Sequence, residues 1–204
     1  MTLTAFVASW LLCLAAAMTP GPAVLMSARI GLREGLATGT ALAFGIGAGA
    51  VFWASTALFG LSILFEYAPT LLIALKVIGA AYLVYLAYRM WRHADDMIEE
   101  VATMATPRSR FSAFKLGVLT QLANPKGPIF FGAVFAGTIP ETVPLWVLGA
   151  LLTLIFIGEA AWNIIVVRIF SFERTRRGYI SLKGVFDRIF GAALAALGAK
   201  IAIT

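Results

Sequence analysis

The chain has 204 residues, of which 61% are hydrophobic and only 13% are charged. A soluble domain carries about 25% charged residues, so this composition excludes an ordinary soluble protein and predicts an integral membrane protein. The net charge is +6, but the basic residues gather in short loops, and no basic surface interleaved with aromatic residues indicates nucleic-acid binding.

Side chains that hold metals or react covalently are scarce. Cys13 is the only cysteine and His93 the only histidine, so we expect no internal disulfide, no transition-metal site and no cofactor. No Ser–His, Cys–His or clustered-carboxylate arrangement indicates catalysis, and we do not expect an enzyme.

Six apolar segments are each long enough to cross a bilayer. They cover residues 3–28, 36–62, 69–88, 116–139, 145–167 and 185–203. The first contains an apolar stretch that ends in three alanines, like a signal peptide, but it lacks a positively charged start and we predict that it is not cleaved. The expected fold is an all-α integral membrane protein with six transmembrane helices.

The loops between these segments alternate in charge. The first, third and fifth loops carry Lys and Arg, whereas the second loop, near Glu66, and the fourth, near Glu141, carry neither. The positive-inside rule places the basic loops in the cytoplasm. Both termini are therefore expected on the outer, periplasmic side.

The long third loop divides the chain into two halves of three spans. We predict a first repeat at residues 1–92, a cytoplasmic linker at 93–114 and a second repeat at 115–204. Because each half has an odd number of spans, the second half enters from the opposite side. Related halves would then form a 3+3 inverted repeat, and matching breaks in helices 1 and 4 support this arrangement.

Two proline motifs lie deep inside the first and fourth spans. They are Thr19-Pro20-Gly21-Pro22 and Asn124-Pro125-Lys126-Gly127-Pro128. Each lies nine residues from the nearest charge outside the motif on its cytoplasmic side, which is about 13 Å along a helix and therefore near the bilayer midplane. A structural kink would explain one such motif. Two at matched depth favour the binding site of a transporter.

Each motif places a capping residue, Thr19 or Asn124, before a proline, which is typical of a helix start. The two half-helices would direct their N-termini, each with about half a positive charge, at the midplane. This arrangement predicts a carboxylate site that a ligand approaches closely at the glycines. The residues assigned to substrate binding are Thr19, Pro20, Gly21, Pro22, Asn124, Pro125, Lys126 and Gly127.

Two ionisable residues, Lys126 and Glu159, also fall near mid-depth. Charges inside a membrane are costly and mark functional candidates. Lys126 either snorkels, forms a structural lock with Glu159, or helps to hold the substrate carboxylate while Glu159 takes up a proton or the substrate ammonium. Asn163 lies four residues after Glu159 on the same helix face and is assigned to the substrate site as well.

The second span contains two small-residue repeats, Gly35-x-x-x-Gly39 and Gly45-x-x-x-Gly49. Such spacing permits close packing between helices. It predicts tight helix contacts. A homodimer is possible, but the spacing does not predict a specific one because it often occurs in spans by chance.

Several stretches resemble the lysine-exporter superfamily, specifically its LysE/RhtB-type amino-acid and homoserine/threonine efflux members. They are MTPGPAVLMSARIGLREGLATGTALAFGIGAG, KVIGAAYLVYLAYRMWR, QLANPKGPIFF and FDRIFGAALAALGAKIA. The resemblance covers nearly the whole chain and implies a six-span inner-membrane exporter, often described as driven by the proton-motive force. The family commonly has Asn where this chain has Ala23, and many members have an acid where it has Ala50. Because of these departures, Glu159 becomes the stronger candidate for the residue that couples transport to protons.

We therefore expect secondary-active efflux of an amino acid or a small derivative across the bacterial inner membrane, coupled to protons. The expected partners are that solute and the lipid bilayer. Two alternatives stay open. One is a non-transporting membrane subunit that scaffolds a partner, and the other is an exporter of a different small solute or ion.

Overall fold

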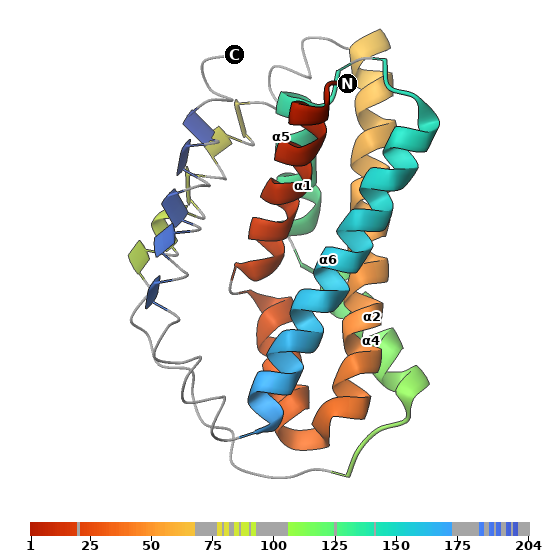
Figure 1. The fold of residues 1–204 in the computed structure, drawn as a ribbon, viewed down its shortest axis with the longest axis vertical. Helices are drawn as coiled ribbons and strands as arrows, with labels where there is room; N and C mark the ends of the chain where they lie inside the picture. Colours follow the sequence, from red (N-terminus) through yellow and green to blue (C-terminus); the bar gives the residue numbers. More distant parts are fainter. Residues whose placement is uncertain are drawn as a thin grey trace.

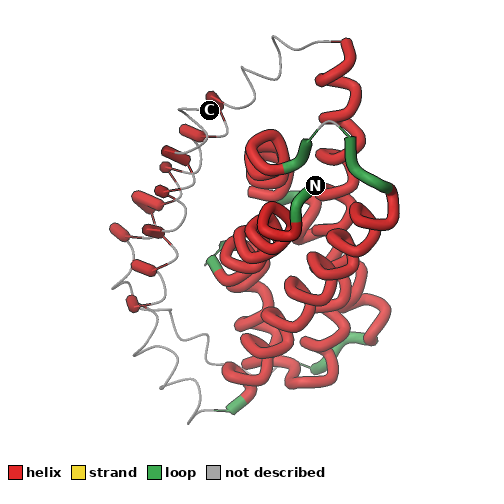
Figure 2. Tube along the Cα trace, turned by 45° about the horizontal axis from the view of Figure 1, so that its top comes forward, coloured by secondary structure: helices red, strands yellow, loops and turns green. Residues whose placement is uncertain are grey.

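The computed structural model describes residues 1–19, 21–67, 106–124, 126–140 and 142–172, with short pieces between 77 and 92 and between 184 and 199. The regular structure in these residues is entirely helical (Figures 1 and 2), which confirms the all-α prediction. The helices are α1 (Leu3–Met18), α2 (Pro22–Tyr67), α4 (Arg110–Leu122), α5 (Lys126–Thr138) and α6 (Leu145–Ser171). The predicted spans at 69–88 and 185–203 and most of the linker lie largely outside the described residues.

Two helices of the described part are long and apolar enough to cross a membrane. They are Pro22–Gly60 within α2 and Leu145–Ser171, which is α6, while α1 is a shorter apolar helix. α6 packs along α2 and also contacts α1, and Figure 1 shows it crossing in front of α2.

α2 reverses direction at Gly35. This residue has φ 80° and ψ −176°, a backbone conformation that a side chain with a Cβ rarely adopts. The turn separates a short arm, residues 22–34, from a long arm, residues 36–67, as Figure 1 shows at the bottom of the molecule. Among the residues that the structure describes, no atom lies within 4 Å of a Cβ built at Gly35. The prediction of close packing at Gly35-x-x-x-Gly39 is therefore wrong for Gly35, which serves the turn, and confirmed for Gly39, where a Cβ would collide with the Val167 side chain of α6.

The second glycine repeat does pack closely against a neighbouring helix. A Cβ at Gly45 would collide with the backbone carbonyl of Phe114 on α4, and one at Gly49 would lie 2.7 Å from the Cβ of Gln121. Gly117 of α4 makes the reciprocal contact with the backbone of Leu42. The prediction of close packing at Gly45-x-x-x-Gly49 is confirmed, since small residues on both helices let the two backbones approach.

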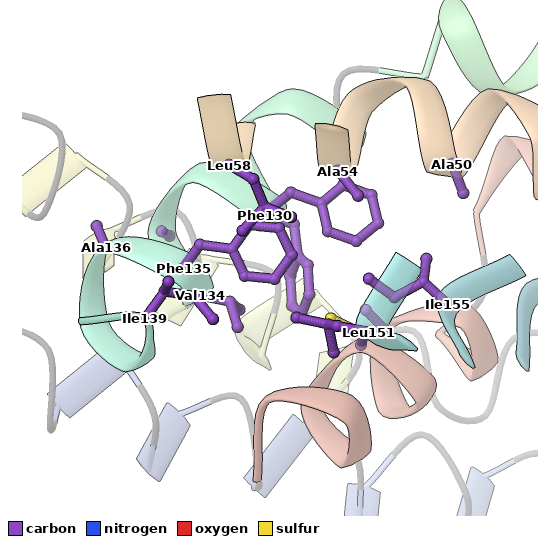
Figure 3. Close-up of a cluster of buried hydrophobic side chains, with 14 of the residues drawn as sticks. Ala50, Ala54, Leu58, Phe130, Val134, Phe135, Ala136, Ile139, Leu151 and Ile155 are labelled. Carbon is purple, nitrogen blue, oxygen red and sulfur yellow. The ribbon is translucent and has the colours of Figure 1, made fainter. Parts of the chain in front are cut away.

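The largest apolar cluster joins α1, the long arm of α2, α5 and α6 (Figure 3). Phe130 and Phe135 of α5 are almost completely buried there, together with Leu151 of α6. Two smaller clusters hold the short arm of α2, one against α4 and the long arm and the other against α6. The short arm is thus enclosed on several sides by apolar contacts.

The turn at Gly35 is tied to the start of α4 by an ion pair. The guanidinium of Arg108 donates from Nη2 to Oε1 of Glu34 at 2.7 Å and from Nε to both carboxylate oxygens at 3.0 Å. The backbone N–H of Arg108 also donates to Oε2 of Glu34 at 2.9 Å. The contact therefore joins the first half of the chain to the end of the predicted linker, just before α4.

Stability should depend on pH through Glu34, which lies in the first predicted loop, outside the spans at 3–28 and 36–62. Burial alone would raise the pKa of Glu34, but the hydrogen bonds and charge of Arg108 together lower it. A lowered pKa stabilises the folded state above the unfolded value of about 4.3, and that stabilisation is lost as the pH falls through the folded value.

We expect Glu34→Gln to lower stability by about 1 kcal/mol at pH 7, a modest loss because the Arg108 side chain is 37% exposed. Thermal denaturation in detergent at several pH values measures this difference. The difference should begin to shrink as the pH falls below the unfolded pKa of about 4.3, and it should disappear as the pH falls through the lower folded pKa, where the wild-type carboxylate becomes protonated. A difference that stays constant from neutral to acidic pH would contradict the assignment.

Candidate functional site

The chain leaves the helix at both proline motifs. α1 ends at Met18 and α2 begins at Pro22, while α4 ends at Leu122 and α5 begins at Lys126. Thr19 and Asn124, which lie in these interruptions, are each only 2% exposed. Pro20 and Pro125 lie outside the described residues. Both interruptions are therefore inside the protein, where their backbone groups need internal partners.

Asn124 caps the start of α5. Its Oδ1 accepts from the backbone N–H of Lys126 at 3.1 Å, and its backbone carbonyl accepts from the N–H of Gly127 at the same distance. Its Nδ2 donates to Oε1 of Gln121 at 3.5 Å. The prediction that Asn124 satisfies an orphan donor at a helix start is confirmed.

Thr19 closes the end of α1. Its hydroxyl donates to the carbonyl of Ala15 at 3.0 Å, and its N–H is shared between the carbonyls of Ala15 and Ala16 at 3.1 Å each. The predicted role of its side chain in starting the next helix is therefore wrong. The hydroxyl faces back along α1 because the last carbonyls of a helix lack partners within it.

Lys126 joins the two interruptions. Its ammonium Nζ donates to the carbonyl of Ala16 at 2.7 Å and to that of Thr19 at 3.4 Å. A Cβ built at Gly21 would lie 3.9 Å from the same Nζ. The structure therefore brings Lys126 together with Thr19 and Gly21, although it is more than a hundred residues from either in sequence.

Glu159 does not form an ion pair with Lys126 in the described part of the chain, so the structural lock, one of the alternatives left open for Lys126, is not seen. The two groups attract each other electrostatically, but the ammonium bonds to the end of α1 instead. Glu159 is 7% exposed. The physical reason is that the negative end of α1 offers carbonyl acceptors directly to the ammonium.

A buried polar chain holds Glu159. Asn163 donates from Nδ2 to the backbone carbonyl of Glu159 at 2.9 Å and to its Oε2 at 3.5 Å. Ser27, on the short arm of α2, donates from Oγ to Oδ1 of Asn163 at 2.7 Å. Asn163 therefore lies on the Glu159 face, as predicted. Ser27 was not predicted to be a site residue, although it is the only polar side chain between Pro22 and Arg29.

Gly127 packs against an aromatic ring. A Cβ there would lie 2.7 Å from Cδ1 of Trp53, whose indole Nε1 donates to the carbonyl of Gln121 at 3.2 Å. Trp53 therefore covers the interruption between α4 and α5. Neither Trp53 nor Gln121 was predicted to be a site residue. Gln121 could have been identified from the sequence, because it is a polar residue close to the proline motif in an apolar segment.

The arrangement suits recognition of a small charged molecule more than chemical conversion. The Lys126 and Glu159 side chains interact electrostatically inside the protein, and amide, hydroxyl and carbonyl groups bond to one or the other of these residues or to their hydrogen-bond partners. Among the described residues, no group of three His, Cys, Asp or Glu side chains is placed to hold a metal ion.

Comparison with known proteins identifies relatives over most of the chain. The family model described as LysE type translocator matches residues 14–204. The threonine efflux protein of Escherichia coli strain K12 is 30% identical over 193 residues, which cover 93% of each chain. The uncharacterized membrane protein YrhP of Bacillus subtilis is 27% identical over 198 residues, covering 91% of this chain and 92% of its own. No solved structure shows a significant match.

These matches confirm the resemblance based on the two proline motifs and the flanking stretches. The relatives named as membrane proteins agree with the long apolar helices of the structure, and the protein is a membrane protein. Because the family model extends over nearly the whole sequence, the chain belongs to the LysE type translocator family.

Proposed function

We propose that this protein is a secondary exporter of an amino acid or a small amino-acid derivative across the bacterial inner membrane. The observation that carries the proposal is the contact between the two buried interruptions through Lys126, with Glu159 beside them. The family match and the threonine efflux relatives favour an amino-acid substrate.

The charges around this contact fit a zwitterion. The N-termini of the short arm of α2 and of α5 would attract a carboxylate, and Glu159 would take the ammonium or a coupling proton. Substrate contacts are assigned to both proline motifs and to Asn163. Each buried charge then meets an opposite charge from the protein or from the substrate, which avoids the penalty of a lone ion.

The proposed architecture is a 3+3 inverted repeat of six spans, with helices 1 and 4 broken at the binding site and both termini periplasmic. In such transporters, one repeat moves against the other around a midplane site. The ends of helices α1 and α4 at Met18 and Leu122 support the two breaks. This motion would expose the site alternately to the cytoplasm and to the periplasm.

The test is export by the purified full chain reconstituted in liposomes. A panel of radiolabelled amino acids, with L-threonine included, is offered with and without a proton gradient. We expect gradient-dependent transport of one or a few amino acids, at least tenfold above protein-free liposomes, and collapse of accumulation by a protonophore. A correctly folded protein that transports no member of the panel would favour the scaffold or a different solute.

A further inference from the structure

We propose that the C-terminal end of α1 is a binding site for a primary ammonium group, which Lys126 occupies in this structure and which the substrate ammonium takes during transport. This inference rests on the proposed function and specifies where the substrate binds. It differs from the sequence-based expectation, in which Glu159 alone receives the ammonium.

The site already holds an ammonium group. Nζ of Lys126 lies 2.7 Å from the carbonyl oxygen of Ala16 and 3.4 Å from that of Thr19. Ala16 is 5% exposed and Thr19 is 2% exposed, so the carbonyls belong to buried residues. Carbonyls at a helix C-terminus carry about half a negative charge and have no partner within the helix.

Glu159 adds a second source of negative charge. It attracts the Lys126 ammonium across the gap between α6 and the end of α1 without bonding to it directly. Its carboxylate is held by Asn163, which is in turn held by Ser27. The Lys126 ammonium therefore meets directional acceptors from α1 and the carboxyl group of Glu159 from α6, and any other ammonium at this position would meet the same groups.

The neighbourhood of Gly21 gives a ligand room to reach the ammonium. In the described part of the chain, a Cβ built at Gly21 has only two atoms within 4 Å beyond its chain neighbours, Nζ of Lys126 and the carbonyl oxygen of Thr19, each at 3.9 Å. These are ordinary van der Waals distances. A substrate atom could therefore occupy this position and touch both the ammonium and one of the carbonyls that bind it.

An exchange between two ammonium groups keeps the charges balanced. When the substrate ammonium binds the carbonyls of Ala16 and Thr19, the displaced Lys126 ammonium lies next to the substrate carboxylate. The site then holds no uncompensated charge in either state, which matters because a lone buried ion is strongly destabilising. Carbonyl acceptors require N–H donors, so the site selects primary ammonium over quaternary ammonium.

The experiment removes the Lys126 side chain and supplies the ammonium from solution. The full-length Lys126→Ala protein is purified in detergent, and its melting temperature is measured with n-propylammonium chloride or, at equal concentration, tetramethylammonium chloride. We expect n-propylammonium to raise the melting temperature of the variant by roughly 5 °C at about 100 times its Kd. Tetramethylammonium should have no effect, and the wild type should respond to neither salt.

Lys115→Ala is the matched control. Nζ of Lys115 lies 4.9 Å from the ring centre of Phe111 on the same helix, away from the interruption, so its removal should create no response to n-propylammonium. If Lys126→Ala does not fold, Lys126→Met with methylammonium gives the same test, since methionine fills most of the volume of the lysine stem. Equal responses to primary and quaternary ammonium, or no response in either folded Lys126 variant, would overturn the site.

Transport separates this inference from the proposed function. If the wild type exports amino acids but the variants do not bind alkylammonium, the function stands and the ammonium site is refuted. If the variants bind alkylammonium but the wild type exports none of the panel, the proposed function fails and the assignment of the site to a substrate fails with it.

Discussion

Gly117→Ala is expected to destabilise the protein by about 1–3 kcal/mol, and Gly117→Leu by more. A Cβ at this position would overlap the backbone carbonyl of Leu42 and lie 2.9 Å from the backbone N of Ile46. Backbone atoms cannot move aside by changing a rotamer. The helices α2 and α4 would have to separate, and the packing of Gly45 against Phe114 would loosen at the same time.

Gly149→Ala is the matched control for this prediction. Gly149 is also helical, but no atom of any described residue lies within 4 Å of a Cβ built on it. The substitution should leave stability unchanged or raise it by about 0.5–1 kcal/mol, because alanine favours the helix. Melting temperatures of both variants in the same detergent decide the matter. Equal changes in melting temperature for the two variants would contradict the close backbone contact between α2 and α4.

Features set by local sequence could be predicted. Asn124 caps α5 because an asparagine before a proline suits a helix start, and Asn163 shares a face with Glu159 because four residues make about one helical turn. Gly45 and Gly49 pack against α4 for a similar reason. In each case, the spacing along one helix is enough to position the residue.

Features that depend on distant contacts could not be predicted in the same way. The bond from Lys126 to Ala16 crosses 110 positions, and its acceptor is a backbone carbonyl, which every residue has. The sequence offered Glu159 as the only oppositely charged side chain at the depth of Lys126, and a pair between them was therefore one of the alternatives left open, whereas a backbone acceptor was not considered. The turn at Gly35 was not predicted for a different reason. A glycine at a spacing that permits helix packing can also adopt a left-handed backbone conformation, and the sequence does not distinguish the two roles.

Glu159→Gln is expected to abolish accumulation of substrate against its gradient, so that the concentration ratio across the membrane falls to about one. Glutamine keeps the shape of the side chain and can still receive the hydrogen bond from Asn163, so folding should be retained. It cannot release a proton or supply a negative charge. If Glu159 carries the coupling proton, the proton gradient no longer drives transport of the substrate in the variant.

The measurement compares proton-driven accumulation with exchange of labelled for unlabelled amino acid in the same liposomes. Exchange needs binding and the conformational change but no net proton movement. The carbonyls of Ala16 and Thr19 remain to receive the substrate ammonium in Glu159→Gln, so exchange should survive with weaker substrate binding even though accumulation does not. Glu34→Gln is the control for loss of a carboxylate, because Glu34 bonds to Arg108 away from the polar chain of Ser27, Asn163 and Glu159. Accumulation by Glu159→Gln at the wild-type level would rule out the proton role. Loss of both activities in a folded variant would instead assign Glu159 to binding the substrate.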